Sequence, residues 1–194
     1  MNNTQLNKVE NVTFLQAMEA YKTILEAIGV NPLREGLADT PKRHIKFLME
    51  FCNPKPFKFT TFDKEDTDEM VVQLNIQYFS LCEHHFLPFY GFAHVGYLPN
   101  NRIVGLSKLA RTVEFISHAP QNQERITSQV AEFLMEKLDA KGVGVLLSGE
   151  HMCMSMRGIS KPGAITYTSK MLGLFKDDKQ IQNQFLERIQ LTNK

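Results

Sequence analysis

The sequence predicts an α+β fold, in which helices flank a mainly antiparallel sheet. Two observations lead to this prediction. Apolar residues recur at steps of three and four near both ends of the chain, which is the period of a helix. Near the middle they alternate with polar residues, which is the period of a strand. The alternating segments are short and bounded by turn residues, as in hairpins.

The N-terminal part predicts two helices. Residues 14–28 carry one apolar face, and a glycine follows at position 29. In the second helix we expect Thr40 as the N-cap and Pro41 at the first helical position. The apolar face of this helix includes Cys52, and the run Asn-Pro-Lys-Pro then ends it.

The middle of the chain predicts strands. From residue 69 onward, apolar residues at 72, 74, 76 and 78 alternate with polar ones, which indicates a half-buried strand. We expect a turn at FLPFYG, residues 86–91, and an antiparallel strand at 92–98. A brief further strand is expected at 102–106.

The C-terminal half predicts three helices and further strands. Ser107 is the expected N-cap of a helix through Phe115. Pro120 is expected to open another helix, which Gly142 ends. Residues 165–169 predict a short strand. One apolar stripe predicts a last helix: Ile181, Phe185 and Ile189.

Composition narrows the class of protein. The 194 residues carry 22 Lys and Arg against 21 Asp and Glu, and this balance argues against a strongly basic nucleic-acid binder. No apolar run approaches the roughly 20 residues of a membrane span, and the N-terminus is polar, unlike a secretory signal. Three cysteines argue against a disulfide framework and for a reducing compartment. We therefore expect a cytoplasmic protein that binds neither nucleic acid nor membrane.

The motif Cys-Glu-His-His at residues 82–85 is a candidate metal site. Its C-x-x-H spacing allows the Cys82 thiolate and the His85 imidazole to reach one ion from a single turn. Zn²⁺ prefers such mixed sulfur and nitrogen ligands in tetrahedral geometry. The alternative is a buried cysteine beside exposed histidines.

A second cluster lies in residues 143–157, which we expect to form a strand. His151, Cys153 and Arg157 have the same parity and would share one face of it. Because an unpaired buried arginine is costly, this face is expected to border a polar cleft. The alternative is a structural histidine and cysteine in the core, with the arginine at the strand end.

Together, Cys82, His85 and Cys153 make a three-ligand set that leaves one zinc position open, as in catalytic sites. The competing arrangement uses Cys52 as a fourth, closing ligand, but its place on an apolar helix face favours a core role.

Two further histidines, His84 and His151, are left to act as general acids and bases near neutral pH. Zinc lowers the pKa of its bound water to about 7, which supplies a hydroxide nucleophile. The site therefore favours a hydrolytic reaction.

A phosphate site is predicted where a helix is expected to begin. Ser107, Lys108 and Arg111 bring two cations to a helix N-terminus, where free N–H groups favour anions. With Arg157 this suits a small phosphorylated molecule, although solvated surface cations are the alternative. No P-loop motif is present.

Gln123 and Glu124 are expected near the start of the next helix. A carboxylate and an amide side by side can recognise the edge of a purine. The alternative is that Glu124 is there because the helix dipole favours it.

Four motifs in this order, CEHHFLPF, GLSKLAR, PQNQER and HMCMSMRG, closely resemble GTP cyclohydrolase I, a zinc-dependent family of pterin biosynthesis. REGLADTPKR and TSKMLGLF resemble its flanking segments, so the likeness runs from about residue 14 to 190. It implies the tunnelling fold, assembled as a homodecamer of two pentamers with active sites at subunit interfaces. We then expect an N-terminal helical segment over 1–65 and a catalytic domain over 66–194, acting as one functional unit.

The resemblance also implies a role for each candidate residue. Zinc would be bound by Cys82, His85 and Cys153. His151 would protonate the N7 side of guanine while zinc-bound water adds to C8, and His84 would serve later proton transfers, including opening of the ribose.

The implied substrate is GTP. Glu124, with Gln123, would bind the guanine edge. The triphosphate would be held by four residues: Ser107, Lys108, Arg111 and Arg157. After an Amadori rearrangement of the sugar, the products would be formate and 7,8-dihydroneopterin triphosphate.

The chain departs from the family in small ways. Ser-His-Ala at 117–119 stands where members often carry basic residues, and Leu172 where they often carry glycine. A further phosphate-binding cation is expected before the first strand, from among Lys55, Lys58 and Lys64.

Two other functions remain open from the residues. One is a non-catalytic nucleotide-binding relative with a structural zinc closed by Cys52. The other, a zinc nucleobase deaminase, is disfavoured because the chain has no C-x-x-C motif.

Overall fold

The structure is a computed structural model, and it describes residues 12–65 and 68–191. The chain divides into two compact units, residues 1–53 and 54–194. The predicted helical segment over 1–65 and catalytic domain over 66–194, acting as one functional unit, stay predictions.

The N-terminal unit contains the two predicted helices. α1 (Phe14–Ala27) is followed by Gly29, whose φ of 78° lies in the left-handed region that glycine tolerates. α2 (Thr40–Phe51) has Asp39 as its N-cap, so Thr40 is already helical and its predicted capping role is wrong by one residue.

A five-stranded sheet forms the centre of the larger unit, in the order β5-β2-β3-β6-β7. Its strands are β2 (Val71–Cys82), β3 (Pro88–Leu98), β5 (Pro120–Gln121), β6 (Gly142–His151) and β7 (Ile165–Gly173). Neighbouring strands are antiparallel, except that β5 runs parallel to the end of β2. The predicted hairpin of β2 and β3 is confirmed, but its turn occupies residues 83–87 and not 86–91.

A second, two-stranded sheet pairs β1 (Thr61–Asp63) with β4 (Arg102–Val104). β4 confirms the brief strand expected at 102–106, whereas β1 was not predicted. Residues 61–63 therefore belong with the larger unit.

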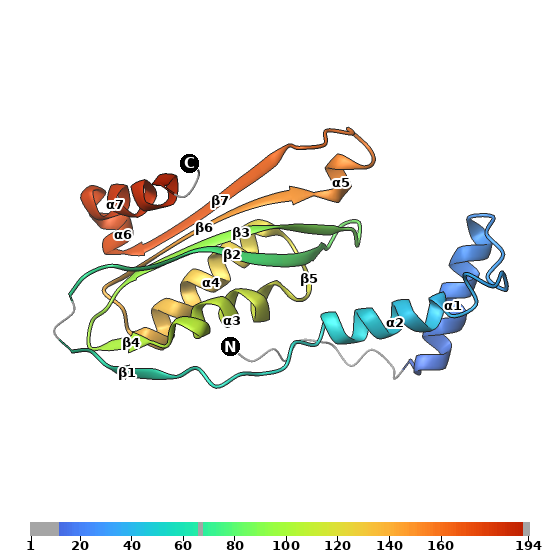
Figure 1. Ribbon diagram of the computed structural model, residues 1–194, viewed down its shortest axis with the longest axis horizontal. Coiled ribbons are helices and arrows are strands. Elements are labelled where there is room, and N and C mark those ends of the chain that lie inside the picture. The colour runs from blue at the N-terminus through green and yellow to red at the C-terminus, as the bar shows by residue number, and fades with distance from the viewer. Residues whose placement is uncertain (1–11, 66–67, 192–194) are drawn as a thin grey trace. The chain divides into compact units, whose positions relative to one another are not determined.

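Helices cover both faces of the large sheet (Figure 1). They are α3 (Leu106–Ser117) and α4 (Gln123–Leu138) on one face, and α6 (Leu174–Asp177) and α7 (Lys179–Gln190) on the other. Alternation along β6 produces this arrangement, because Val145 and Leu147 pack under α4 while Leu146 between them packs towards α7. The α+β prediction is confirmed. None of the helices in the described part of the chain is long and apolar enough to span a membrane.

Two predicted helix starts are wrong. The N-cap of α3 is Gly105, so Ser107 lies inside the first turn. Pro120 does not open α4, because it pairs with β2 as part of β5. Asn122 caps α4 instead, and its side-chain oxygen accepts a hydrogen bond from the Arg125 amide at 2.8 Å.

The last strands also differ from the prediction. α4 ends before Asp139, which adopts a left-handed φ of 46°, and Gly142 is the first residue of β6. β6 ends at His151 and does not continue to residue 157. β7 extends beyond 169 to Gly173 because it pairs with β6 from Gly142 to Glu150.

Candidate metal centre

The turn between β2 and β3 presents Cys82 and His85 together. The carbonyl of Cys82 accepts hydrogen bonds from the amides of His85 (3.3 Å) and Phe86 (2.7 Å), and its own amide donates to Leu87 (2.8 Å). This tight turn places Sγ of Cys82 3.7 Å from Nδ1 of His85. The C-x-x-H spacing therefore brings both side chains to one point, as predicted.

Cys153 reaches the same point by a route that the sequence did not predict. It lies on α5 (Met152–Ser155), a single helical turn that follows β6. His151, Cys153 and Arg157 therefore do not share a strand face, and that prediction is wrong. The register of β6 on β3, with His151 opposite Phe89, instead brings the end of β6 beside the hairpin turn.

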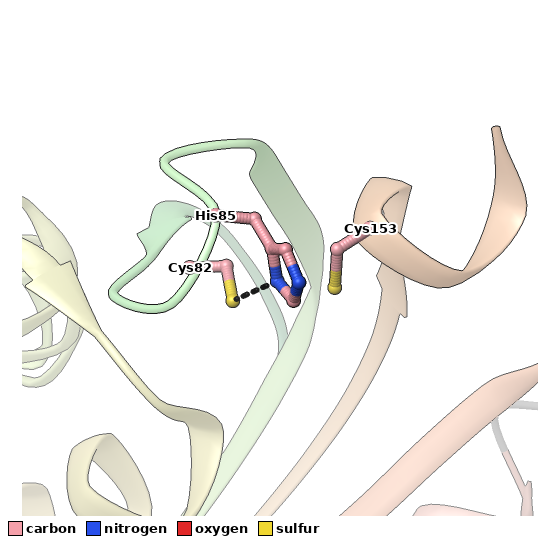
Figure 2. A group of neighbouring side chains, drawn as sticks. All are labelled: Cys82, His85 and Cys153. Atoms are coloured by element: carbon pink, nitrogen blue, oxygen red, sulfur yellow. Dashed lines mark hydrogen bonds between the residues drawn. The ribbon is translucent and has the colours of Figure 1, made fainter. Parts of the chain in front are cut away.

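The ligand atoms of Cys82, His85 and Cys153 all lie within 4.8 Å of one another (Figure 2). Two zinc ligands in tetrahedral geometry lie roughly 3.5–4 Å apart, so a small closing movement suits the group to Zn²⁺. Cys82 is buried, Cys153 is half-buried and His85 is exposed, so the group has a side that faces solvent. Cys52 belongs to the N-terminal unit, so the closed four-ligand alternative stays a prediction.

The surroundings of Cys153 oppose an uncompensated negative charge on its sulfur. Burial raises the pKa of the Cys153 thiol, and the neighbouring Cys82 raises it further. Two thiolates in contact repel each other unless a metal ion compensates their charge. The donor set and its geometry therefore both fit zinc.

His84 lies between the proposed ligand Cys82 and the carboxylate of Glu83. Its Nδ1 is 4.0 Å from Sγ of Cys82, and its Nε2 is 3.8 Å from a carboxylate oxygen of Glu83. Its side chain is 70% exposed. It is therefore accessible from solvent.

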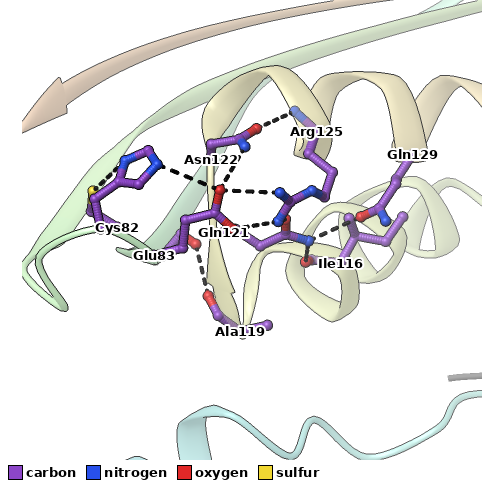
Figure 3. Close-up of polar contacts among 10 residues, drawn as sticks. Cys82, Glu83, Ile116, Ala119, Gln121, Asn122, Arg125 and Gln129 are labelled. Carbon is purple, nitrogen blue, oxygen red and sulfur yellow. Dashed lines mark hydrogen bonds and ion pairs between the residues drawn. The ribbon is translucent and has the colours of Figure 1, made fainter. Parts of the chain in front are cut away.

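Glu83 anchors the turn through contacts that sequence reasoning missed (Figure 3). Arg125 binds its carboxylate with two hydrogen bonds, at 2.6 and 3.0 Å, and the Asn122 side chain donates a third at 2.9 Å. Hydrogen bonds from Arg125 and Asn122 lower the pKa of the Glu83 carboxyl. The backbone amide of Glu83 also donates to the carbonyl of Gln121 in β5. The start of α4 is thereby tied to the metal-binding turn.

The only sequence signal for this contact was that Glu83 lies within CEHH and Arg125 within PQNQER, two of the motifs already identified.

His151 is held from two directions. Its ring stacks on Phe89, with centroids 4.5 Å apart and planes 6° from parallel. Its Nε2 lies 2.9 Å from the side-chain oxygen of Gln123. Burial lowers the pKa of His151, and the nearby charge of Glu124 acts in the opposite direction.

The structure separates the two predicted purine-binding residues. Gln123 is almost fully buried, whereas its neighbour Glu124 is exposed on the first turn of α4. Glu124 is thus accessible to a ligand, and the amide of Gln123 faces the protein interior.

The predicted phosphate-binding residues lie on two elements. Ser107, Lys108 and Arg111 occupy the first turns of α3, and Arg157 lies in the loop after α5. Within the described part of the chain, no ion pair engages the side chains of these three cations. Of the three candidate lysines, Lys64 is ion-paired with Asp68.

Comparison with known proteins gives one consistent result. The family model of GTP cyclohydrolase I matches residues 17–190. A GTP cyclohydrolase 1 of Pelagibacter ubique is 50% identical over 186 residues, which cover 93% of this chain and 92% of that protein. The GTP cyclohydrolase 1 of Bacillus subtilis is 50% identical over 179 residues, covering 90% and 94%. That of Streptococcus agalactiae serotype V is 49% identical over 178 residues, covering 89% and 95%.

Among solved structures, the archaeosine synthase QueF-Like in its apo form aligns with a TM-score of 0.47 at 12% identity. The alignment covers 56% of this chain and 97% of that one, and it is too weak to support an argument.

Proposed function

The chain belongs to the GTP cyclohydrolase I family, and from this premise we propose how its residues carry out the reaction. The protein is a hydrolase that opens the guanine imidazole ring of GTP, releasing formate and forming 7,8-dihydroneopterin triphosphate. This reaction begins pterin biosynthesis. Family membership favours the enzyme over the non-catalytic alternative.

We propose that Cys82, His85 and Cys153 hold a zinc ion. The supporting observation is that their ligand atoms all lie within 4.8 Å of one another. When bound by three protein ligands, zinc supplies Lewis acidity that lowers the pKa of water in its remaining position to about 7. This arrangement of three ligands, flanked by two further histidines, is the main support for the proposal.

His151 and His84 are proposed to move the protons. His151 is held in a fixed plane by Phe89, so it can deliver a proton to one defined atom, the N7 of guanine. His84 is exposed, so a substrate can reach it for the later transfers, including opening of the ribose. The difference in their environments suits these different tasks.

The substrate is proposed to lie between α3, α4 and the loop after α5. Glu124 is exposed and can accept two N–H bonds from the guanine edge, whereas the predicted direct contact of Gln123 stays a prediction. The triphosphate is proposed to bind four residues: Ser107, Lys108, Arg111 and Arg157.

Assembly and location are proposed from the family resemblance: a homodecamer in the cytoplasm with active sites at subunit interfaces and the tunnelling fold. One face of the sheet supports an interface, because Phe79, Phe92 and Tyr167 are exposed on it. Light scattering coupled to size-exclusion chromatography tests the assembly, and a monomeric mass would contradict it.

The reaction is tested with purified, zinc-loaded protein and GTP. We expect formate and, after oxidation, a fluorescent pterin. If zinc-replete protein gives neither product, the proposed mechanism is overturned. His151→Ala should retain zinc and lose turnover, whereas loss of the metal from this variant would make His151 a ligand.

A further inference from the structure

The side chain of Gln123 is only 1% exposed, and its amide nitrogen is fully used. Nε2 donates to the backbone carbonyls of Thr166 (3.0 Å) and Leu147 (3.3 Å) and to the hydroxyl of Thr168 (3.1 Å). Backbone carbonyls accept hydrogen bonds and cannot donate them. The orientation of the amide is therefore determined, with its nitrogen towards the strands and its oxygen towards His151.

This orientation determines which ring nitrogen of His151 carries hydrogen. The oxygen of Gln123 can only accept, and it lies 2.9 Å from Nε2 of His151. Nε2 must therefore bear a hydrogen. A neutral imidazole has one ring hydrogen, so Nδ1 is left with its lone pair. Within the described residues no hydrogen bond reaches Nδ1 of His151, which leaves that atom available.

The surroundings are built to keep the amide in place. Thr168, one of its acceptors, is itself held by a 2.6 Å hydrogen bond to Thr127 on α4. Position 149 on β6 is glycine, and a Cβ there would lie 2.5 Å from the Gln123 oxygen. The stacked Phe89 ring fixes the imidazole plane, so the hydrogen bond to Gln123 defines the remaining rotation within that plane.

We propose that Gln123 is a positioning residue, which holds His151 in the Nε2–H form so that its Nδ1 alone exchanges a proton with the substrate. In the forward step the N–H bond at Nδ1 of the imidazolium breaks, its electron pair stays on Nδ1, and the proton forms an N–H bond at guanine N7. The ring returns to its neutral Nε2–H form. The catalytic part of this inference rests on the proposed role of His151.

The two ends of the amide allow a matched pair of variants. Gln123→Met removes both the acceptor for His151 and the donors to the strands. Gln123→Glu loses the amide donors but keeps an oxygen that accepts from Nε2–H. A merely structural glutamine would be damaged similarly in both, whereas a positioning glutamine is partly rescued by glutamate. Thr168→Val removes an acceptor at the nitrogen end and the bond to Thr127, but leaves the Gln123 oxygen in place, so it serves as the control.

The tautomer is read by solid-state NMR on zinc-loaded protein labelled with ¹³C and ¹⁵N histidine, at a pH where the ring is neutral. The His151 signal is identified by its disappearance in His151→Asn. We expect hydrogen on Nε2 in the wild type, Gln123→Glu and Thr168→Val. In Gln123→Met we expect hydrogen on Nδ1 or a mixture of both forms.

Formate release supplies the second readout. General acid catalysis contributes about 10²–10⁴-fold, so we expect kcat of Gln123→Met to fall at least about tenfold, with KM for GTP changed less. Gln123→Glu should recover part of kcat.

Hydrogen on Nδ1 in the wild type overturns the proposal, as does Gln123→Met with the wild-type tautomer and kcat. A rise in KM alone overturns it in favour of direct substrate contact. If Gln123→Met does not fold, the His151 tautomer in the spectra of the wild type, Gln123→Glu and Thr168→Val decides whether the proposal stands. If the wild type releases no formate, the proposed function fails while the tautomer is still measured.

Discussion

Replacing Gly149 by alanine should damage the active site through Gln123 and Tyr78, neither of which is a proposed metal ligand or proton carrier. The added Cβ would lie 2.5 Å from the Gln123 side-chain oxygen and 2.7 Å from the Tyr78 hydroxyl. Real contacts of a Cβ essentially never fall below 3.0 Å, so both groups must shift. Neither shifts easily, because the amide is held by three acceptors and Tyr78 is only 2% exposed.

The size of the effect follows from these distances. Overpacking of this kind costs about 1–3 kcal/mol of unfolding free energy. The Gln123 oxygen has to retreat by about 0.5 Å or more, which takes its 2.9 Å hydrogen bond with His151 towards the limit of a useful interaction. Because a misplacement of about 1 Å can cost 10²-fold in rate, we expect kcat to fall about tenfold.

Urea unfolding, formate release and bound zinc together test this reasoning. Gly149→Ala should lose stability and kcat and keep its zinc. Gly36→Ala is the matched control, because no atom lies within 4 Å of its Cβ position and its φ is ordinary, so stability should be unchanged or slightly higher. Wild-type stability and kcat in Gly149→Ala would refute the packing argument.

Two further predictions concern the metal and the acid side of the pH range. Cys153→Ser should bind zinc at least about tenfold more weakly in a competition titration, whereas Cys52→Ser should keep zinc; the reverse result would revive the closed structural site. Glu150 accepts hydrogen bonds from Ser155 (2.8 Å) and the Gly163 amide (3.1 Å), and these bonds lower the pKa of its carboxyl. Because the pKa of this carboxyl is lower in the folded protein than in the unfolded chain, the carboxylate stabilises the fold at pH values above the ordinary carboxyl pKa of about 4.3. This stabilisation is lost as the pH falls through the folded-state pKa. Glu150→Gln should therefore lower the melting temperature more at pH 7 than at pH 3, and an equal loss at both would contradict this role.

Local patterns were sufficient for most of the elements. The 3.6-residue period predicted α1 and α7, and the alternation from residue 72 predicted β2, because both patterns depend on neighbours a few positions away. The predictions failed where a distant partner decides. Pro120 resembles a helix start, yet it pairs with β2, and the predicted strand 143–157 ends at His151 where its neighbour β3 begins.

The candidate metal ligands show the same division. Cys82 and His85 could be paired from their spacing, because one turn of backbone suffices to bring them together. Cys153 was predicted to join them from a strand, whereas the structure brings it beside them from α5, and only the register of β6 on β3 explains its position.

By itself, then, the chain specified its periodic elements, its motifs and the kind of chemistry that cysteine and histidine can support. Only the tertiary structure decided which side chains meet. The bonds from Arg125 to Glu83 and from His151 to Gln123 join residues 42 and 28 positions apart. Contacts over such separations depend on which strands pair and in which register, and no local pattern encodes that choice.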